Sequence, residues 1–329
     1  MGTKGSVIRT MAMAAALMLV LTVGSASAQK INMCENDWPV FQIPKGMQML
    51  GMLNDFNIVH EKYEACLFGA KTGRYDIVFF SLFEFMGMVH DSANTVVIGV
   101  LDHTEGADMI VLRPEITSAS QLKGKSVALQ TDTLSLQLLY YYLTKNNMTL
   151  EDVKLVHIPV ENLSKAFLAT NSLAGIVGWN PLTDEAVAGG GVIAASSRDF
   201  PDKMMSDLIV VNRDSLKKNR AVYKDFLKKW FPAISNPAVL EKTAEYAKMS
   251  VDELKKQLAG VPLYYDAPSM LQARNKIKKE TVPELQALFK TKPANIPGAA
   301  ARFFGKEPLN ADPWFDDSLL LELVSEQGN

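Results

Sequence analysis

Two tryptophans lie in short segments predicted to follow β-strands, each with a polar neighbour that could contact a small molecule. Trp38 comes directly after Asp37, and Trp179 comes directly before Asn180. An aromatic ring attracts cations over its face, and a carboxylate accepts charge-assisted hydrogen bonds from N–H groups. These residue types therefore favour a cationic or nitrogen-rich solute. A packing role for each tryptophan and a solvated Asp37 are the alternatives that the sequence leaves open.

Further polar residues are expected at the same place because they also follow or begin predicted strands: Ser81, Glu84, Thr131, Thr133 and Asp207. In open parallel sheets, ligands bind beyond the carboxyl ends of the strands. Several of these segments precede a helix, whose first backbone N–H groups are free to hold a polar or anionic group. Ser81 and Thr133 could also be simple helix caps.

The charged residues in these segments distinguish between a cationic and an anionic solute. An oxyanion pocket often uses Arg or Lys, and the segments named above contain neither. We therefore expect a small amine-, urea- or guanidine-like solute. An anion such as a sulfonate or nitrate is the alternative, because helix N-termini are expected at the same cleft.

Catalytic signatures are largely missing. There is no G-x-S-x-G turn for a serine nucleophile and no phosphate-cradling loop, and His60-Glu61 lacks the second histidine of a zinc-protease helix. The four histidines show no ligand spacing with one another or with the cysteines, so neither a metal site nor a cofactor is expected. We expect a binding protein and no enzyme activity. An enzyme or a sensor subunit that uses the same cleft is less favoured.

The sequence has two cysteines, Cys34 and Cys66. Cys34 follows the first predicted strand, and Cys66 lies shortly after the second. These strands are usually neighbours in a doubly wound sheet, so the two thiols could meet and form a disulfide in an oxidising compartment. Two buried, unpaired thiols are the alternative.

The hydrophobic pattern predicts an α/β protein with two lobes. Strand and helix patterns alternate through the first two thirds of the chain, and helical periodicity dominates the rest. Two short apolar strands, 108–113 and 207–212, bracket one block of this alternation, as expected where a chain leaves one lobe and returns to it. We expect a clam-shell in which residues 29–107 and 213–329 form lobe I, with its helical C-terminal segment, and residues 108–212 form lobe II. Each lobe would be a doubly wound sheet, with a cleft between them.

The N-terminus has the pattern of an export signal. Lys4 and Arg9 precede an apolar stretch, residues 11–23, and small residues follow at positions 26–28. Cleavage after Ala28 would leave 301 residues (329 minus 28) and change the formal net charge from −2 to −4. No basic face suggests a nucleic-acid partner. A retained membrane anchor is the alternative to cleavage.

Several stretches resemble the type II periplasmic solute-binding proteins of ABC importers, in the group that binds nitrate, sulfonates, taurine and thiamine precursors. The resemblance rests on residues 106–111, 122–128, 177–182 and 196–201. A subset linked to urea carboxylase and guanidine-type systems is similar at residues 37–39, 257–265 and 314–318. The resemblance implies a periplasmic, monomeric protein that delivers a small solute to a membrane permease and its ATPase. This chain departs from its relatives at Leu134-Ser135-Leu136 and at residues 80–84, so their ligand does not transfer directly.

Overall fold

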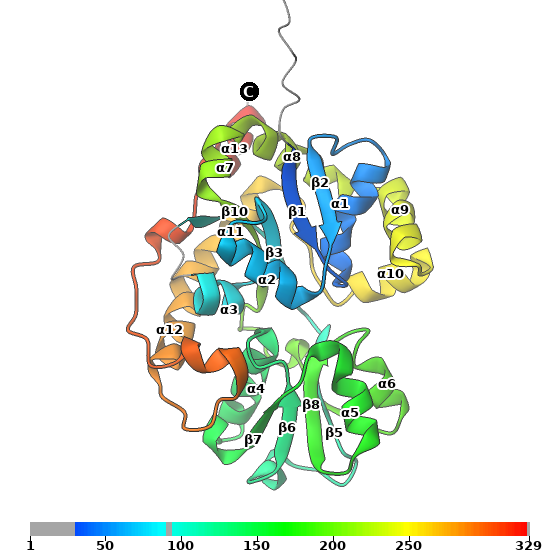
Figure 1. The fold of residues 1–329 in the computed structure, drawn as a ribbon, viewed down its shortest axis with the longest axis vertical. Helices are drawn as coiled ribbons and strands as arrows, with labels where there is room; N and C mark the ends of the chain where they lie inside the picture. The colour runs from blue at the N-terminus through cyan, green and yellow to red at the C-terminus, as the bar shows by residue number, and fades with distance from the viewer. Residues whose placement is uncertain (1–29, 90–93, 328–329) are drawn as a thin grey trace, which may run out of the picture. The chain divides into compact units, whose positions relative to one another are not determined.

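The computed structural model describes residues 30–89 and 94–327. The described residues from Ile31 onward form one compact unit, whose strands build two five-stranded sheets (Figure 1). The expected export signal, residues 1–28, lies outside the described residues. Within the described ranges, no helix combines the length and the apolar character that a membrane crossing requires.

The first sheet has the order β2-β1-β3-β10-β4. Its strands are β1 (Ile31–Glu35), β2 (Phe56–His60), β3 (Ile77–Ser81), β4 (Thr95–His103) and β10 (Ser206–Asn212). Strands β2, β1 and β3 are parallel, whereas β10 is antiparallel to both of its neighbours. The sheet is therefore mixed.

The second sheet repeats this plan with the order β7-β6-β8-β5-β9. Its strands are β5 (Asp108–Leu112), β6 (Ser126–Leu129), β7 (Lys154–His157), β8 (Leu173–Trp179) and β9 (Val192–Ser196). Here β5 is the antiparallel strand, between β8 and β9. Each sheet thus has one antiparallel strand that adjoins a connection to the other sheet.

The placement of β10 corrects one expectation. The sequence analysis assigned residues 108–212 to lobe II, but β10 lies between β3 and β4 in the first sheet. The chain therefore crosses back before β10, in the segment after β9. The physical reason is that β10 is buried along most of its length and completes the first sheet through two antiparallel ladders.

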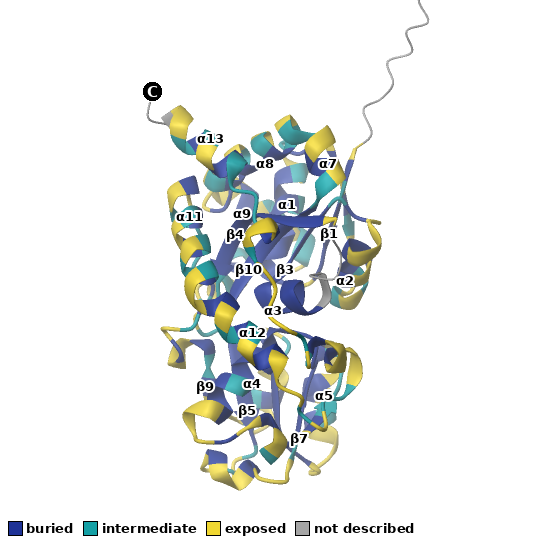
Figure 2. Cartoon of the chain, turned by 90° about the vertical axis from the view of Figure 1, so that its left-hand side faces the viewer, coloured by how far each residue is buried: buried dark blue, intermediate teal, exposed yellow. Residues whose placement is uncertain are grey.

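Helices pack on both sheets and dominate the C-terminal third of the chain. In chain order they are α1 (Pro39–Met49), α2 (Tyr63–Thr72), α3 (Leu82–Glu84), α4 (Leu134–Lys145), α5 (Leu163–Ala169), α6 (Asp184–Ala188), α7 (Arg213–Lys218), α8 (Arg220–Ala233), α9 (Pro237–Ala247), α10 (Val251–Leu258), α11 (Ala267–Lys276), α12 (Val282–Lys290) and α13 (Ser318–Gln327). Figure 2 shows that the strands are mostly buried, while the outward faces of the helices are exposed.

Aromatic side chains form much of the core beneath the first sheet. Phe79 of β3 contacts Phe226 and Trp230 of α8, with ring centroids 6.4 Å and 6.2 Å away. All three are almost completely buried. Burial of such large apolar side chains is a main source of stability. This packing fixes β3, whose C-terminal end carries Ser81.

The C-terminal segment also reaches the second sheet's helices. Glu284 of α12 accepts a hydrogen bond from Tyr141 of α4, with 3.1 Å between the oxygens, and pairs with Lys203. Further along, the carbonyl of Pro297 accepts a hydrogen bond from Thr131 at 2.9 Å. The helical tail is therefore attached to elements that carry both sheets.

Candidate functional site

A small cavity lies between elements of the first sheet and elements of the second. The described residues that line it are Trp38, Phe41, Tyr63, Ser81, Glu84, Thr104, Asp108, Leu134, Trp179, Met205 and Asp207. The centres of water-sized spheres can occupy about 30 Å³ of it, which is room for about two water molecules. In this conformation the cavity therefore fits a solute of only a few non-hydrogen atoms.

Strand register brings two aspartates to the cavity. Asp207 of β10 lies opposite Ser81 of β3, and Asp108 of β5 lies opposite Trp179 of β8. Both aspartates are at the beginning of the antiparallel strand in their sheet, next to a connection between the sheets. Each is more than nine-tenths buried. The topology thus places one carboxyl from each sheet at the same cavity.

Glu84, the last residue of the short helix α3, supplies a third carboxyl. Ser81 Oγ donates a hydrogen bond to Oε2 of Glu84, and Tyr63 Oη donates to Oε1 at 2.9 Å. The backbone N–H of Leu134, at the N-terminus of α4, donates to the same Oε1 at 3.1 Å. Glu84 therefore joins a first-sheet helix to a helix that follows β6 of the second sheet.

The three carboxyls are held in an environment that disfavours their charged forms. Burial, together with the charge of Asp207, raises the pKa of Glu84 to about 8. Burial and the charge of Asp108 raise the pKa of Asp207 to about 8. Burial also raises the pKa of Asp108 to about 7. Among the described lining residues there is no Lys, Arg or His to compensate these charges.

A fourth carboxyl lies behind Asp207. Asp102 of β4 is opposite Asp207 in the strand ladder and is 1% exposed. Burial, followed by the charges of Asp207 and Asp108, raises its pKa well above the ordinary value. Neither of its carboxyl oxygens has a hydrogen-bond partner among the described residues. The cluster of buried carboxyls therefore extends from the cavity wall to the next strand of the first sheet, β4.

Aromatic rings line the cavity beside the carboxyls. Trp179 lies edge-on to Trp38, with ring centroids 6.3 Å apart, and is 5.7 Å from the ring of Tyr63. The buried indole N–H of Trp38 makes no hydrogen bond within the described part of the chain. It still lies close enough to Asp207 to lower the pKa of that carboxyl somewhat. The wall offers π faces beside the carboxyls, with the indole N–H of Trp38 next to Asp207.

The structure brings together a majority of the residues that the sequence suggested. Those that line the cavity are Trp38, Ser81, Glu84, Trp179 and Asp207. Ser81 is also the N-cap of α3, because its Oγ accepts a hydrogen bond from the Phe83 N–H. Capping and lining the cavity are compatible roles.

Two predicted residues have structural partners away from the cavity lining. Asp37 has a 75% exposed side chain beside His60, 3.5 Å away. Asn180 donates its backbone N–H to the carbonyl of Ala107 at 3.0 Å, and its side chain accepts from Thr183. Neither is among the residues that line the cavity.

The two predicted threonines lie before α4, outside the cavity lining. Thr133 caps α4, since its Oγ1 accepts from the Ser135 N–H and donates to the carbonyl of Gln130. Thr131 Oγ1 lies 2.9 Å from His157 Nδ1. Their polar groups are thus already used within the protein.

Sequence reasoning missed several lining residues, of which Tyr63, Thr104 and Asp108 are polar. Tyr63 is the first residue of α2, and Thr104 lies in the connection between the sheets. Asp108 begins a strand that the sequence predicted, just as Asp207 begins its strand. Symmetry between the two crossover strands was therefore a signal that could have identified Asp108.

Cys34 and Cys66 form a disulfide, with 5.6 Å between their Cα atoms. This confirms the expected bridge, and the alternative of two free thiols is wrong for this structure. The bridge links β1 to α2. Tyr63 on α2 and Trp38 shortly after β1 both line the cavity, so the disulfide holds together two segments of its wall.

Comparisons with known proteins agree on the fold of this chain. The family described as "NMT1/THI5 like" matches residues 89–233. No curated protein matches the chain. The alkanesulfonate-binding protein of Xanthomonas axonopodis pv. citri, solved with bound MOPS, is similar with a TM-score of 0.64 and 14% identity, over 84% of this chain and 96% of that one.

Two further solved structures have the same architecture. The ligand-binding component of an ABC-type import system from Staphylococcus aureus, solved with zinc bound, has a TM-score of 0.66 and 11% identity, over 90% of this chain and 99% of that one. The periplasmic nitrate-binding protein of Synechocystis PCC 6803 has a TM-score of 0.54 and 13% identity, over 70% of each chain. The chain therefore has the periplasmic-binding-protein fold, as expected.

Proposed function

We propose that this protein is the periplasmic solute-binding component of an ABC importer and that its solute is a small nitrogen-containing cation. The observation that supports this most directly is the composition of the cavity wall. Glu84, Asp108 and Asp207 are buried around one small space, and no cationic side chain lines it among the described residues. A bound cation would compensate the negative charges of these three carboxyls.

The aromatic residues support the same kind of solute. Trp38, Tyr63 and Trp179 present ring surfaces next to the carboxyls. A cation at a ring face gains about 0.5–2 kcal/mol, most where water is excluded. Planar N–H groups on the solute could also donate to carboxylate oxygens in charge-assisted hydrogen bonds. Guanidinium and methylammonium have the size and charge that this wall suits.

An anion is the second candidate, because two of the solved relatives are named for sulfonate and nitrate binding. An anion here would have to approach three carboxyls, so it would require all of them to be protonated. The raised pKa values of Glu84 and Asp207 make protonation accessible near neutral pH. This candidate predicts tighter binding at lower pH, opposite to the cation.

In the proposed cycle the solute would contact both lobes and stabilise their closed arrangement. The contact between Glu84 and Leu134 already joins elements of the two sheets at 3.1 Å. Delivery to a membrane permease and its ATPase follows from the family resemblance of the sequence.

The test is a thermal-shift panel with guanidinium, methylammonium, tetramethylammonium, urea, nitrate and methanesulfonate, each supplied at the same ionic strength. A ligand that binds only the folded state raises the unfolding temperature in a concentration-dependent way. We expect a saturable shift with a small cation. A saturable shift with an anion and none with the nitrogen compounds would overturn the proposal.

A further inference from the structure

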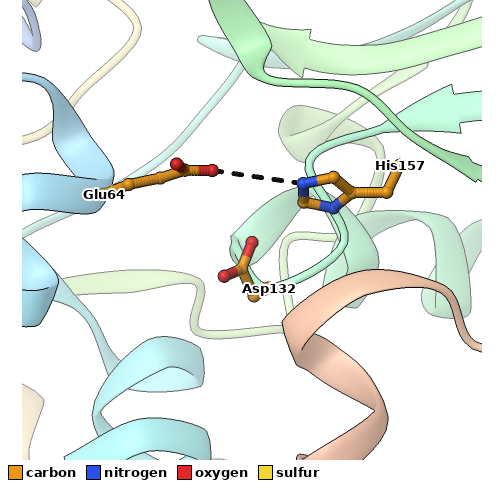
Figure 3. A group of neighbouring side chains, drawn as sticks. All are labelled: Glu64, Asp132 and His157. Atoms are coloured by element: carbon orange, nitrogen blue, oxygen red, sulfur yellow. Dashed lines mark ion pairs between the residues drawn. The ribbon is translucent and has the colours of Figure 1, made fainter.

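Three potential metal ligands meet outside the cavity lining, at the boundary between elements of the two sheets. Glu64 lies on α2, which follows β2 of the first sheet. Asp132 lies between β6 and α4, and His157 is the last residue of β7. One potential ligand atom from each lies within 4.8 Å of the other two. Figure 3 shows the three side chains pointing toward a common point.

Hydrogen bonds orient the His157 ring for this role. Thr131 Oγ1 donates to the carbonyl of Pro297 at 2.9 Å. The Thr131 backbone N–H donates to His157 Nδ1 at 3.3 Å, and Oγ1 lies 2.9 Å from the same nitrogen, where the direction of the hydrogen bond depends on the ring tautomer. A metal ion on Nε2 requires the tautomer with its proton on Nδ1, and Oγ1 is placed to accept a hydrogen bond from that N–H because its own proton is donated to Pro297. Nε2 faces Glu64, at 4.0 Å from its Oε1.

Asp132 provides an independent indication of a missing partner. Asp132 is only 5% exposed, and its Oδ1 has no hydrogen-bond partner among the described residues. A buried carboxylate oxygen without a partner is costly. In Figure 3 the carboxyl group is directed toward the space between Glu64 and His157.

We propose that Glu64, Asp132 and His157 bind a divalent metal ion of the zinc type, with water completing its coordination. An imidazole nitrogen and two carboxylate oxygens are ligands that zinc accepts, at bond lengths of about 2.0–2.2 Å. A metal-bound histidine usually donates its other ring N–H to a neighbouring acceptor, and in the metal-bound tautomer Thr131 Oγ1 would take that place for His157. Glu64 is 55% exposed along its side chain, and its Oε1 accepts a hydrogen bond from Gln130 Nε2 across 3.4 Å; a rotation that brings the carboxylate to the metal ion would replace this long hydrogen bond.

The ion would link the lobes. Glu64 comes from a first-sheet element, while Asp132 and His157 come from second-sheet elements. Metal binding would therefore favour the closed arrangement independently of the solute in the cavity. This inference does not rest on the proposed function, because it concerns other residues and another ligand.

The experiment is a calorimetric titration of the untagged protein with zinc chloride and no other ligand. We expect one ion per chain, and binding at least about tenfold weaker in Asp132→Asn and in His157→Gln. Thr131→Val, which removes the support for the ring, should also weaken binding about tenfold. Thermal unfolding without metal checks that each variant folds; Asp132→Asn should be no less stable, because it removes an unpartnered buried charge.

His60→Gln is the matched control. His60 also lies between two carboxylates, 3.0 Å from Glu35 and 3.5 Å from Asp37, but all three belong to first-sheet elements or the loop after β1. We expect zinc binding to be unchanged in this variant. Three results would each overturn the proposal: no binding to the parent protein, which would leave only a Glu64–His157 ion pair; binding that survives both ligand substitutions; or binding that is lost only in His60→Gln.

Discussion

Oε1 of Glu84 accepts a hydrogen bond from the backbone N–H of Leu134 across 3.1 Å. Glu84 lies in α3, directly after β3 of the first sheet. Leu134 is the first residue of α4, which follows β6 of the second sheet. A single carboxyl oxygen thus contacts both halves of the cavity wall. A change in the charge of Glu84 should therefore alter the contact between these two elements, and under the proposed function it should alter solute binding as well.

Replacement of Glu84 by Gln should remove most of the affinity for a cationic solute while the fold is retained. Gln keeps an oxygen that can accept from Tyr63 and Leu134, but it has no negative charge. Hydrogen bonds to charged groups are worth about 1.5–3 kcal/mol, so affinity should fall about ten- to a hundredfold. Asp37→Asn is the control, since Asp37 is exposed and outside the cavity lining. Equal losses in the two variants would contradict the assignment.

The empty protein should lose stability as pH rises from about 4 to about 8. Folding raises the pKa of Glu84 from 4.5 and of Asp207 from 3.8, each to about 8. Between those values the folded state binds protons that the unfolded state has released, so stability decreases with pH by up to about 1.4 kcal/mol per unit for each group. Denaturant titrations across this range should show a shallower decrease for Glu84→Gln. An identical or steeper decrease in the variant would count against this reading.

Replacement of Trp179 by Leu should weaken binding of a cation more than it weakens the fold. Leu keeps an apolar side chain at the position but removes the ring that faces Trp38 and Tyr63. The loss should be about 0.5–2 kcal/mol of binding free energy, and Trp179→Phe should recover part of it. Titration of both variants with the solute measures the difference. Leu and Phe variants that bind alike would exclude a role for the ring.

Loss of the disulfide should destabilise the protein without abolishing solute recognition. The bridge closes a loop between residues separated by 32 positions, which corresponds to about 3 kcal/mol through restriction of the unfolded chain. The Cys34→Ala/Cys66→Ala double variant should unfold at a lower denaturant concentration by that free energy. Unchanged stability of the double variant relative to the oxidised parent would show that the bridge contributes little.

Local patterns were sufficient to predict much of the fold. All strands of the described residues correspond to apolar runs in the sequence, because runs such as residues 77–80 have no other stable environment than a buried sheet. The sheet to which β10 belongs was not predictable in the same way. Its apolar residues 208–211 would suit a buried strand in either lobe, and only the ladders to β3 and β4 decide to which sheet the strand belongs.

The residues of the candidate site differ in the same way, since some could be predicted from the sequence and others could not. Ser81, Glu84 and Trp179 could be proposed because strand ends are readable from the sequence. Asp132 and His157 could not be recognised as partners, since they meet Glu64 only after β6, β7 and α2 are assembled. The expectation of no metal site rested on ligand spacing along the chain, which does not reveal ligands that separate elements contribute.

The most direct test of the central claim is calorimetric titration of the protein with guanidinium chloride at about pH 6 and about pH 9, with sodium nitrate in parallel. A cation favours the ionised carboxyls of Glu84, Asp108 and Asp207, whose pKa values lie at about 7 to 8. We therefore predict that guanidinium binds more tightly at the higher pH and releases protons to the buffer at the lower pH, while nitrate gives no saturable heat. Saturable nitrate binding that strengthens at the lower pH, without guanidinium binding at either pH, would contradict the account.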